Sequence, residues 1–281
     1  MTTEQPLILN LAPTGMTPTR ERSAHVPLQP QEIVKDVIDC TRRGISMVHI
    51  HAREDDDQPS HKKDIYARII SGIREQAPEL VICVSCSGRV ENSFERRAEV
   101  LELEGDLKPD MASLTLSSLN FPTGASLNAP KMVVDLATAM QDRGIVPEIE
   151  VFDLGMVHVL NRLAETGKLR PPFYVNILLG NLATAQARFL DIGAIVSSLP
   201  PGTVYSLAGL GASQLPVAAM AVGQAPGVRI GLEDNLWYDS GRTIPATNLG
   251  LVEKVHQLAD VLNRPILSPS ALRKTLALTR A

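Results

Sequence analysis

Two histidines stand two residues apart in the apolar stretch MVHIHARED, residues 47–55. Side chains at positions i and i+2 of a β-strand point to the same face, so His49 and His51 are expected to project together. Two neutral imidazoles bind a divalent metal when a third ligand lies close to them. The spacing alone also fits a hydrogen-bonded structural pair, and both interpretations stay open at this point.

A carboxylate that could complete such a set lies in RIGLEDN, residues 229–235. If this stretch is a strand to residue 233, Arg229 and Glu233 share one face and Asp234 begins the following loop. Two imidazoles and one carboxylate are a known catalytic zinc set, in which Zn²⁺ acts as a Lewis acid or acidifies bound water. Arg229 beside Asp234 indicates a cation that orients and holds ionised a carboxylate able to accept a proton. A stabilising ion pair is the alternative.

Further polar pairs occur near the ends of other predicted strands. They are Ser85 with Ser87, Ser113 with Thr115, and Glu148 with Glu150. Burying such groups without a partner costs roughly 1 to 3 kcal/mol each, so we expect a ligand, a metal or water among them. Cys83 and Cys86 have C-x-x-C spacing but fall on opposite faces of a strand, which argues against a redox or zinc pair.

Short runs of β-forming residues alternate with helix-like segments along the chain. We predict eight strands, at residues 7–12, 47–52, 80–86, 111–116, 148–153, 173–179, 203–208 and 228–233. Eight βα units in a chain of 281 residues predict a single-domain (β/α)₈ TIM barrel over residues 1–281, with a last helix near 268–278. A doubly wound open sheet is the competing fold. The barrel predicts that function lies at the C-terminal ends of the strands.

Two loops stand out in this scheme. Residues 12–30 are rich in turn residues and charges, which suits a loop that covers a substrate. SLAGLGASQ, residues 206–214, brings Gly209 and Gly211 to the start of a helix, where a phosphate or an acyl oxygen could bind. A plain tight turn is the alternative. The remaining histidines, which lie in helices or loops, are predicted to be partnerless surface or packing residues: His25, His61, His158 and His256.

The composition excludes several classes of function. The chain is 44% apolar with a formal charge of −4 and has no basic stripe, so nucleic acid is not an expected partner. Its apolar runs fall short of the roughly 18 residues that a membrane helix needs. Three cysteines and an N-terminus without the features of a signal peptide predict a reducing, cytoplasmic location.

Five stretches taken together resemble the β-keto acid cleavage enzymes, whose founding activity is 3-keto-5-aminohexanoate cleavage: HIHARED, SCSG, PEIEVFDLGM, AGLG and VRIGLEDN. The resemblance implies a zinc-dependent barrel that reacts a β-keto acid with acetyl-CoA, giving acetoacetate and a new acyl-CoA, and it suggests a homotetramer. It implies that His49, His51 and Glu233 are the metal ligands. It also implies that Arg229 and Asp234 are the catalytic pair, with Asp234 as the base.

The resemblance implies contacts with the substrates as well. Ser85 and Ser113 match hydroxyl positions near the substrate. Apart from the resemblance, Glu150 is expected to face the barrel lumen from its strand, where it could take part in catalysis by hydrogen-bonding the substrate or a group that supports a metal ligand. Asp234 would form the carbanion of the acetyl-CoA methyl group, which would attack the ketone polarised by the metal. Thr17 or a neighbour stands where relatives that accept the amino substrate are expected to place an acid. The stretch RER at 20–22 follows, so an anionic or neutral substrate tail is as plausible as a cationic one.

Two other functions remain possible from the sequence. One is another divalent-metal-dependent barrel enzyme, an aldolase or acyl-CoA lyase, that has the metal site without the CoA acceptor. The other is a catalytically idle ligand-binding barrel. The C-terminal segment ALRKTLAL, residues 271–278, would either form a tetramer interface or cap its own barrel.

Overall fold

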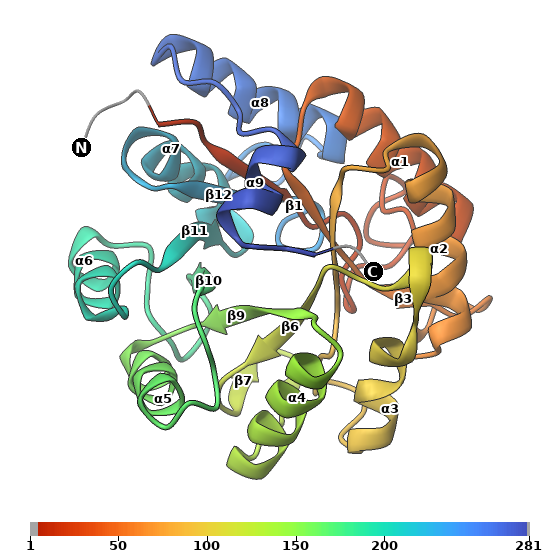
Figure 1. Ribbon diagram of the computed structural model, residues 1–281. Coiled ribbons are helices and arrows are strands. Elements are labelled where there is room, and N and C mark those ends of the chain that lie inside the picture. Colours follow the sequence, from red (N-terminus) through yellow and green to blue (C-terminus); the bar gives the residue numbers. More distant parts are fainter. Residues whose placement is uncertain (1–4, 280–281) are drawn as a thin grey trace.

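The computed structural model describes residues 5–279 and shows a closed barrel of parallel strands in the order β1-β12-β11-β10-β9-β6-β5-β2. The predicted TIM barrel is therefore confirmed, and the open sheet is wrong. Figure 1 shows the barrel surrounded by helices. Because residues 1–4 and 280–281 lie outside the described range, the boundaries 1–281 of a single domain stay a prediction.

The barrel strands are short, and most of their residues are buried. They are β1 (Ile8–Leu11), β2 (Met47–Ile50), β5 (Val81–Val84), β6 (Met111–Thr115), β9 (Val146–Val151), β10 (Tyr174–Leu179), β11 (Val204–Gly209) and β12 (Gly227–Ile230). β1 pairs with both β2 and β12, which closes the barrel and places the strand that carries His49 two positions from β12. The loops that follow β2 and β12 are thus close enough in the ring to share one site.

Helices cover the outside of the barrel, and the last one closes one of its ends. They are α1 (Pro30–Arg43), α2 (Lys63–Gln76), α3 (Phe94–Ala98), α4 (Pro130–Asp142), α5 (Leu154–Glu165), α6 (Phe189–Ser198), α7 (Gln214–Gln224), α8 (Asn248–Val261) and α9 (Pro269–Thr275), with 3₁₀ turns at Glu99–Glu102, Gly105–Leu107 and Gly211–Ser213. α1 shows why they pack inward, since Ile33, Val37 and Ile38 bury one face of it. No helix within the described residues is long and apolar enough to cross a membrane.

The last barrel strand is shorter than the sequence predicts. β12 ends at Ile230, so Glu233 does not lie on the strand, and it follows in a turn. Gly231 explains the early end, because it has a φ of +151° and a Cβ there would lie 2.0 Å from the Ala12 carbonyl oxygen. The amides of Asp234 and Asn235 then donate back to the Gly231 carbonyl at 3.2 and 3.3 Å, which closes the turn.

Two short hairpins, which the sequence analysis did not predict, rise from the loops after barrel strands. β3 (Ala52–Arg53) pairs with β4 (Pro59–Ser60), and β7 (Leu119–Phe121) pairs with β8 (Gly124–Ser126). Arg53 fastens the first of them to loop 12–30, donating to the carbonyls of Gly15, at 2.7 and 3.0 Å, and of Pro18, at 3.0 Å. These hairpins extend the wall around the C-terminal end of the barrel.

The opposite end of the barrel is closed by the C-terminal helix. α9 lies across this end in Figure 1, and Leu272 and Leu276 are fully buried in a cluster inside the barrel. The two leucines share this cluster with Ile8, Met47 and Met111. The segment 271–278 therefore caps its own barrel, which confirms one of the two roles expected for it.

Candidate metal centre and active site

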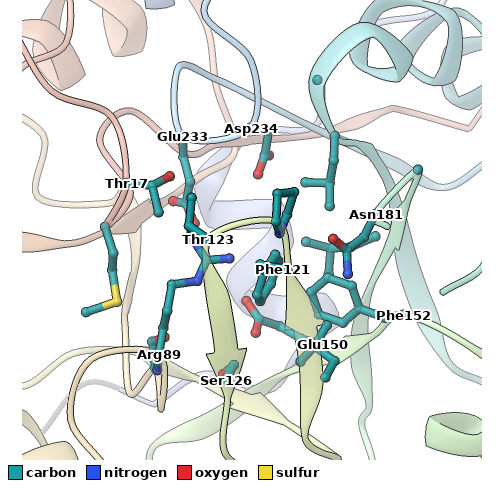
Figure 2. Close-up of a pocket in the computed structure, with 18 of the residues that line it drawn as sticks. Thr17, Arg89, Phe121, Thr123, Ser126, Glu150, Phe152, Asn181, Glu233 and Asp234 are labelled. Carbon is teal, nitrogen blue, oxygen red and sulfur yellow. The ribbon is translucent and has the colours of Figure 1, made fainter. Parts of the chain in front are cut away.

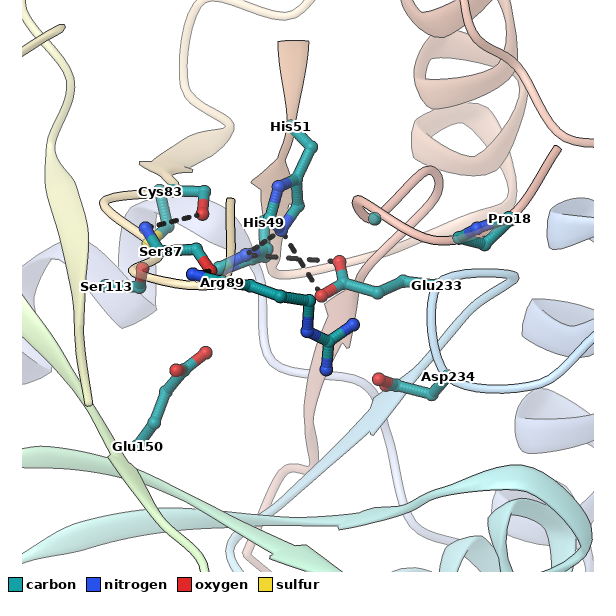
Figure 3. Close-up of polar contacts among 12 residues, drawn as sticks. Pro18, His49, His51, Cys83, Ser87, Arg89, Ser113, Glu150, Glu233 and Asp234 are labelled. Carbon is teal, nitrogen blue, oxygen red and sulfur yellow. Dashed lines mark hydrogen bonds and ion pairs between the residues drawn. The ribbon is translucent and has the colours of Figure 1, made fainter. Parts of the chain in front are cut away.

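The structure brings His49, His51 and Glu233 together at the C-terminal end of the barrel (Figure 3). The Nε2 atoms of His49 and His51 lie 3.2 Å apart. The carboxylate of Glu233 lies 3.3 Å from His51 Nε2 and 3.9 Å from His49 Nε2. β2 presents the first histidine, the second follows the end of that strand, and the turn after β12 supplies the acid.

The unsatisfied atoms of this cluster test whether it suits a metal ion. Glu233 Oε2 is buried and has no hydrogen-bond partner. The two Nε2 atoms face each other, although two neutral imidazoles can share only one proton between them. A cation held between two ring nitrogens and a carboxylate oxygen would satisfy all three groups, and this donor set is one that zinc accepts. The residues therefore fit a divalent metal.

Glu148 sets the orientation of His49, a role that the sequence analysis missed. Its Oε2 lies 2.5 Å from His49 Nδ1, and its Oε1 accepts from Asn10 Nδ2 at 2.8 Å and from Asn176 Nδ2 at 2.7 Å. A carboxylate that binds the Nδ1 hydrogen leaves Nε2 as a lone pair aimed at the metal position. The sequence did offer a sign of this role. Glu148 and Glu150 lie two residues apart, and this spacing places both acids on the inner face of β9.

A second group of potential ligands, His49, Cys83 and Glu148, lies deeper in the barrel. Burial raises the pKa of the Cys83 thiol well above its usual value, and this thiol donates to Glu148 Oε2 at 3.1 Å. This deeper group is therefore a hydrogen-bond network that supports His49. Cys86 lies beyond the end of β5, which is shorter than the predicted strand, and belongs to a different hydrophobic cluster from Cys83.

Burial and neighbouring charges shift the pKa values of these groups in different directions. Burial lowers the pKa of His51 to about 4, although Glu233 opposes this shift. For Glu148, burial favours the protonated form, but the charges of His49 and Arg229 outweigh it and lower the pKa to about 2. Burial also acts to lower the pKa of His49, and the charges of Glu148 and Glu233 raise it instead. Glu148 is thus ionised, as its role toward His49 requires.

Arg229 on β12 holds two carboxylates of the turn that follows. Its Nε and Nη2 donate to Asp234 Oδ2 and Oδ1 at 3.0 and 3.1 Å, and Nη2 lies 2.8 Å from Glu233 Oε1. The fork fixes the orientation of Asp234. Burial and the charge of Glu233 nevertheless raise the pKa of Asp234 despite Arg229. We expected Arg229 to hold Asp234 in its ionised form. This expectation is incomplete, because Arg229 also pairs with Glu233, and the negative charge of Glu233 disfavours ionisation of Asp234.

The turn that carries Glu233 and Asp234 is anchored on three sides. Asn248 Oδ1 accepts from the Leu232 amide at 2.9 Å, and Nδ2 donates to the Pro13 carbonyl at 3.0 Å and to Asp36 at 2.6 Å. Gly15, with a φ of +68°, packs so closely that a Cβ there would lie 2.6 Å from Glu233 Cγ. The amide of Gly211 donates to the Asp234 carbonyl at 2.7 Å.

A cavity of about 580 Å³ opens above these groups, and Figure 2 shows part of its lining. Among the predicted substrate residues, Thr17, Ser85, Ser113 and Gly211 line it, together with His51, Glu150, Arg229, Glu233 and Asp234. Gly209 does not line it, because a Cβ at that position would lie 2.3 Å from the Ser213 carbonyl oxygen, which marks a close packing contact. The volume suits a small organic substrate.

A model of the beta-keto acid cleavage enzyme family matches residues 6–278 of the chain. The protein belongs to this family. It is 33% identical over 276 residues to the 3-keto-5-aminohexanoate cleavage enzyme of Acetoanaerobium sticklandii, an alignment that covers 98% of this chain and 99% of the relative. It is also 33% identical over 278 residues to the 3-oxoadipate:acetyl-CoA acetyltransferase of Cupriavidus necator, covering 98% and 95%. As a beta-keto acid cleavage enzyme, the protein is an enzyme of the acyltransferase type.

Solved structures support the fold of this beta-keto acid cleavage enzyme. The apo structure of ObcA superimposes with a TM-score of 0.76 at 20% sequence identity, covering 91% of this chain and 66% of the ObcA chain. At this identity the likeness concerns the fold alone. The chain thus spans about two thirds of the length of that neighbour.

Two further residues complete the description of the enzyme's polar groups. Glu150 accepts from Thr115 Oγ1 at 2.5 Å and lies 3.8 Å from Arg229 Nη1, and burial raises the pKa of Glu150.

His256 was expected to lack partners, and this is wrong, because its Nε2 lies 2.8 Å from the Gly44 carbonyl and its Nδ1 3.2 Å from Arg43 Nη1. It joins the end of α1 to α8, a contact between distant segments that local sequence does not reveal.

Proposed function

We propose that this enzyme binds Zn²⁺ through His49, His51 and Glu233 and reacts a β-keto acid with acetyl-CoA, yielding acetoacetate and a new acyl-CoA. One observation carries the proposal: His51, Glu233 with its partnerless oxygen and the Arg229–Asp234 pair line one cavity, and the imidazole of His49 faces that of His51 from just behind the wall. A metal position and a positioned base thus meet where a substrate can enter. The names of the relatives supply the reaction class.

Atom balance decides which carbon loses the proton. Acetoacetate contains the acetyl group of acetyl-CoA bonded to the C2 methylene of the keto acid, so the new bond joins C2 to the thioester carbonyl carbon. Asp234 therefore removes a proton from C2 of the keto acid, and the expectation that the acetyl-CoA methyl group is deprotonated is wrong. The CoA thiolate released in this step then attacks the C3 ketone, the C2–C3 bond breaks, and the carbanion takes up a proton.

The residues of the chain would divide this work as follows. Asp234 accepts and returns the proton at C2, and Arg229 keeps its carboxylate oriented through the fork of hydrogen bonds. Ser85, Ser113 and Thr17 present hydroxyl groups to the cavity, while Glu150 and Gly211 lie at its wall and complete the proposed contacts with the substrates. When bound, Zn²⁺ would supply Lewis-acid polarisation of the keto group.

Metal analysis and product analysis of the purified protein test this function together. We expect about one zinc per chain, lost in His49→Ala, and acetoacetate from at least one β-keto acid incubated with acetyl-CoA. A protein that binds no divalent metal would contradict the metal site. Release of a cleavage product without any new CoA ester would instead favour the aldolase or acyl-CoA lyase.

Two properties of the whole enzyme are also proposed. A homotetramer follows from the family resemblance, and its interface does not use the apolar face of α9, which is buried in its own barrel. A cytoplasmic location agrees with the three free cysteines, Cys40, Cys83 and Cys86. Light scattering coupled to gel filtration checks the mass expected of four chains.

A further inference from the structure

Arg89 places a cation inside the cavity without a polar partner. It follows β5, its side chain is half-buried, and in Figure 3 it extends toward the space between Glu150, Glu233 and Asp234. Within residues 5–279, its guanidinium makes no hydrogen bond and no ion pair. Its close contact is the ring of Phe121, whose centroid lies 3.5 Å from the guanidinium carbon. The ring holds the cation in place and leaves its donors free.

The acids nearest to Arg89 are already engaged by other groups. Glu233 pairs with His51 and Arg229, and Asp234 accepts hydrogen bonds from both Nε and Nη2 of Arg229. Glu150 accepts from Thr115. Burial lowers the pKa of Arg89 while these three charges oppose the shift, but an arginine stays protonated at neutral pH. The free donors of this half-buried cation face the cavity and are available to a ligand that supplies acceptors.

The rest of the cavity wall also favours an anion. Two more arginines, Arg22 and Arg242, line it, and no acid of loop 12–30 does. Thr17 and Arg22 are the polar residues of this loop that line the cavity, and Glu21 does not line it. An ammonium group on a substrate would meet these arginines, and the carboxylates of the lining already pair with other groups: Glu233 and Asp234 with Arg229, and Glu150 with Thr115. A carboxylate would find five guanidinium donors at Arg89.

We propose that Arg89 binds a carboxylate at the far end of the β-keto acid, so that the substrates of this enzyme are β-keto dicarboxylic acids. This rests on the proposed function, in which Zn²⁺ would polarise the keto group. If the C1 carboxylate lies with the keto group at the metal position, the tail carboxylate is the second anionic group of the keto acid and the one left for Arg89. Phe121, Phe152 and Leu178 line the same cavity and suit the methylene groups between the two ends. Phe152 supports the ring of Phe121 edge-on, with centroids 5.8 Å apart.

Three six-carbon β-keto acids that differ in tail charge test the assignment. The zinc-loaded enzyme is given 3-oxoadipate, 3-oxohexanoate or 3-keto-5-aminohexanoate with acetyl-CoA, and acetoacetate is measured. We expect kcat/KM to be highest for 3-oxoadipate, by roughly 10-fold or more over 3-oxohexanoate. Arg89→Met should lower kcat/KM for 3-oxoadipate by roughly 10- to 100-fold and change that for 3-oxohexanoate by less than about 3-fold.

Matched variants separate this role from others. Arg96→Met, at an exposed arginine on α3 that pairs with Glu99, should leave the preference unchanged. Arg89→Glu should abolish turnover of 3-oxoadipate and improve that of the amino substrate. If Arg89→Met lowered kcat/KM equally for all three acids, the proposal would be overturned, because Arg89 would then contact a part of the substrate other than the tail. A wild-type preference for the amino substrate would overturn it too.

A binding measurement keeps the proposal testable if no acid is turned over. Calorimetric titration of the zinc-loaded enzyme with 3-oxoadipate, without acetyl-CoA, should show binding that Arg89→Met weakens by roughly 10-fold or more. Binding without turnover would contradict the proposed function and leave the role of Arg89 standing. Equal binding of 3-oxoadipate and 3-oxohexanoate would contradict the role of Arg89 alone.

Discussion

His49 is prepared for metal binding by a residue that does not touch the metal position. Glu148 is fully buried and ionised, and it occupies Nδ1 so that Nε2 faces His51 and Glu233. Asn10 and Asn176 fix the other oxygen of that carboxylate. The metal affinity of the site is therefore expected to depend on groups inside the barrel as well as on the three ligands.

Replacing Glu148 by Gln tests this dependence. The amide keeps the shape of the side chain but removes the charge that holds the Nδ1 hydrogen, so zinc affinity should fall by about 10- to 100-fold. Competition with a chromophoric chelator measures the affinity, and circular dichroism checks the fold. Glu165→Gln, at an exposed acid on α5, is the control. Unchanged affinity would mean that Glu148 does not tune His49.

Replacing Asp234 by Asn tests the base. Asn still accepts a hydrogen bond from Arg229 but cannot take up the proton from C2, so kcat should fall by roughly 10²- to 10⁴-fold. Zinc content, measured by elemental analysis, should stay near that of the wild type, since Asp234 is not one of the three ligands. Full activity in the variant would remove Asp234 from this role.

At the scale of elements, the turn after β12 is the part that assembles the site. It carries Glu233 and Asp234, and it is tied to the β1 loop, α1 and the start of α8 through Asn248. The metal ligand from this turn is thus positioned by three segments that are far apart in the sequence.

Replacing Asn248 by Ala should therefore loosen the turn. The buried amide of Leu232 and carbonyl of Pro13 would lose their partner, which is expected to cost about 1 to 3 kcal/mol of unfolding free energy. Urea denaturation measures this loss. Asn161→Ala, which removes one exposed contact with the Ser198 carbonyl, should cost less than about 0.5 kcal/mol. Equal losses in the two variants would argue against an anchoring role.

These elements were predictable to different degrees. Alternating β and helical segments predicted the barrel, and the i, i+2 rule placed His49 beside His51. The end of β12 was not predictable, because it depends on the contact between Gly231 and the distant Ala12 carbonyl. The hairpin that carries Phe121 was missed for a similar reason, since its strands are only three residues each. Asn248 gave no signal, because its partners come from other segments.

At the scale of the molecule, the two ends of the barrel have different tasks. The C-terminal ends of the strands carry the polar site, and the other end is a packed core sealed by α9. Arg273 of α9 binds both oxygens of Asp110 at 2.8 Å, which locks the helix in place. Stability and catalysis should therefore respond separately to substitutions at the two ends.

Leu276→Ala tests this separation. It leaves a cavity in the sealed end and should lower the unfolding free energy by about 2 to 5 kcal/mol. The value of kcat/KM at 25 °C, for whichever β-keto acid is turned over, should stay within about 2-fold of the wild type, because folded molecules keep the site intact. Val261→Ala, at an exposed position on α8, is the stability control. A large loss of kcat/KM in the folded variant would show that the two ends are coupled.

The fate of isotopic label tests the central claim most directly. The zinc-loaded enzyme is incubated with an unlabelled β-keto acid and acetyl-CoA carrying ¹³C at both acetyl carbons, and the products are read by NMR. The proposed reaction predicts acetoacetate labelled at C3 and C4 only, together with an unlabelled new acyl-CoA. Acetoacetate without label, or cleavage of the keto acid with no new CoA ester, would contradict it.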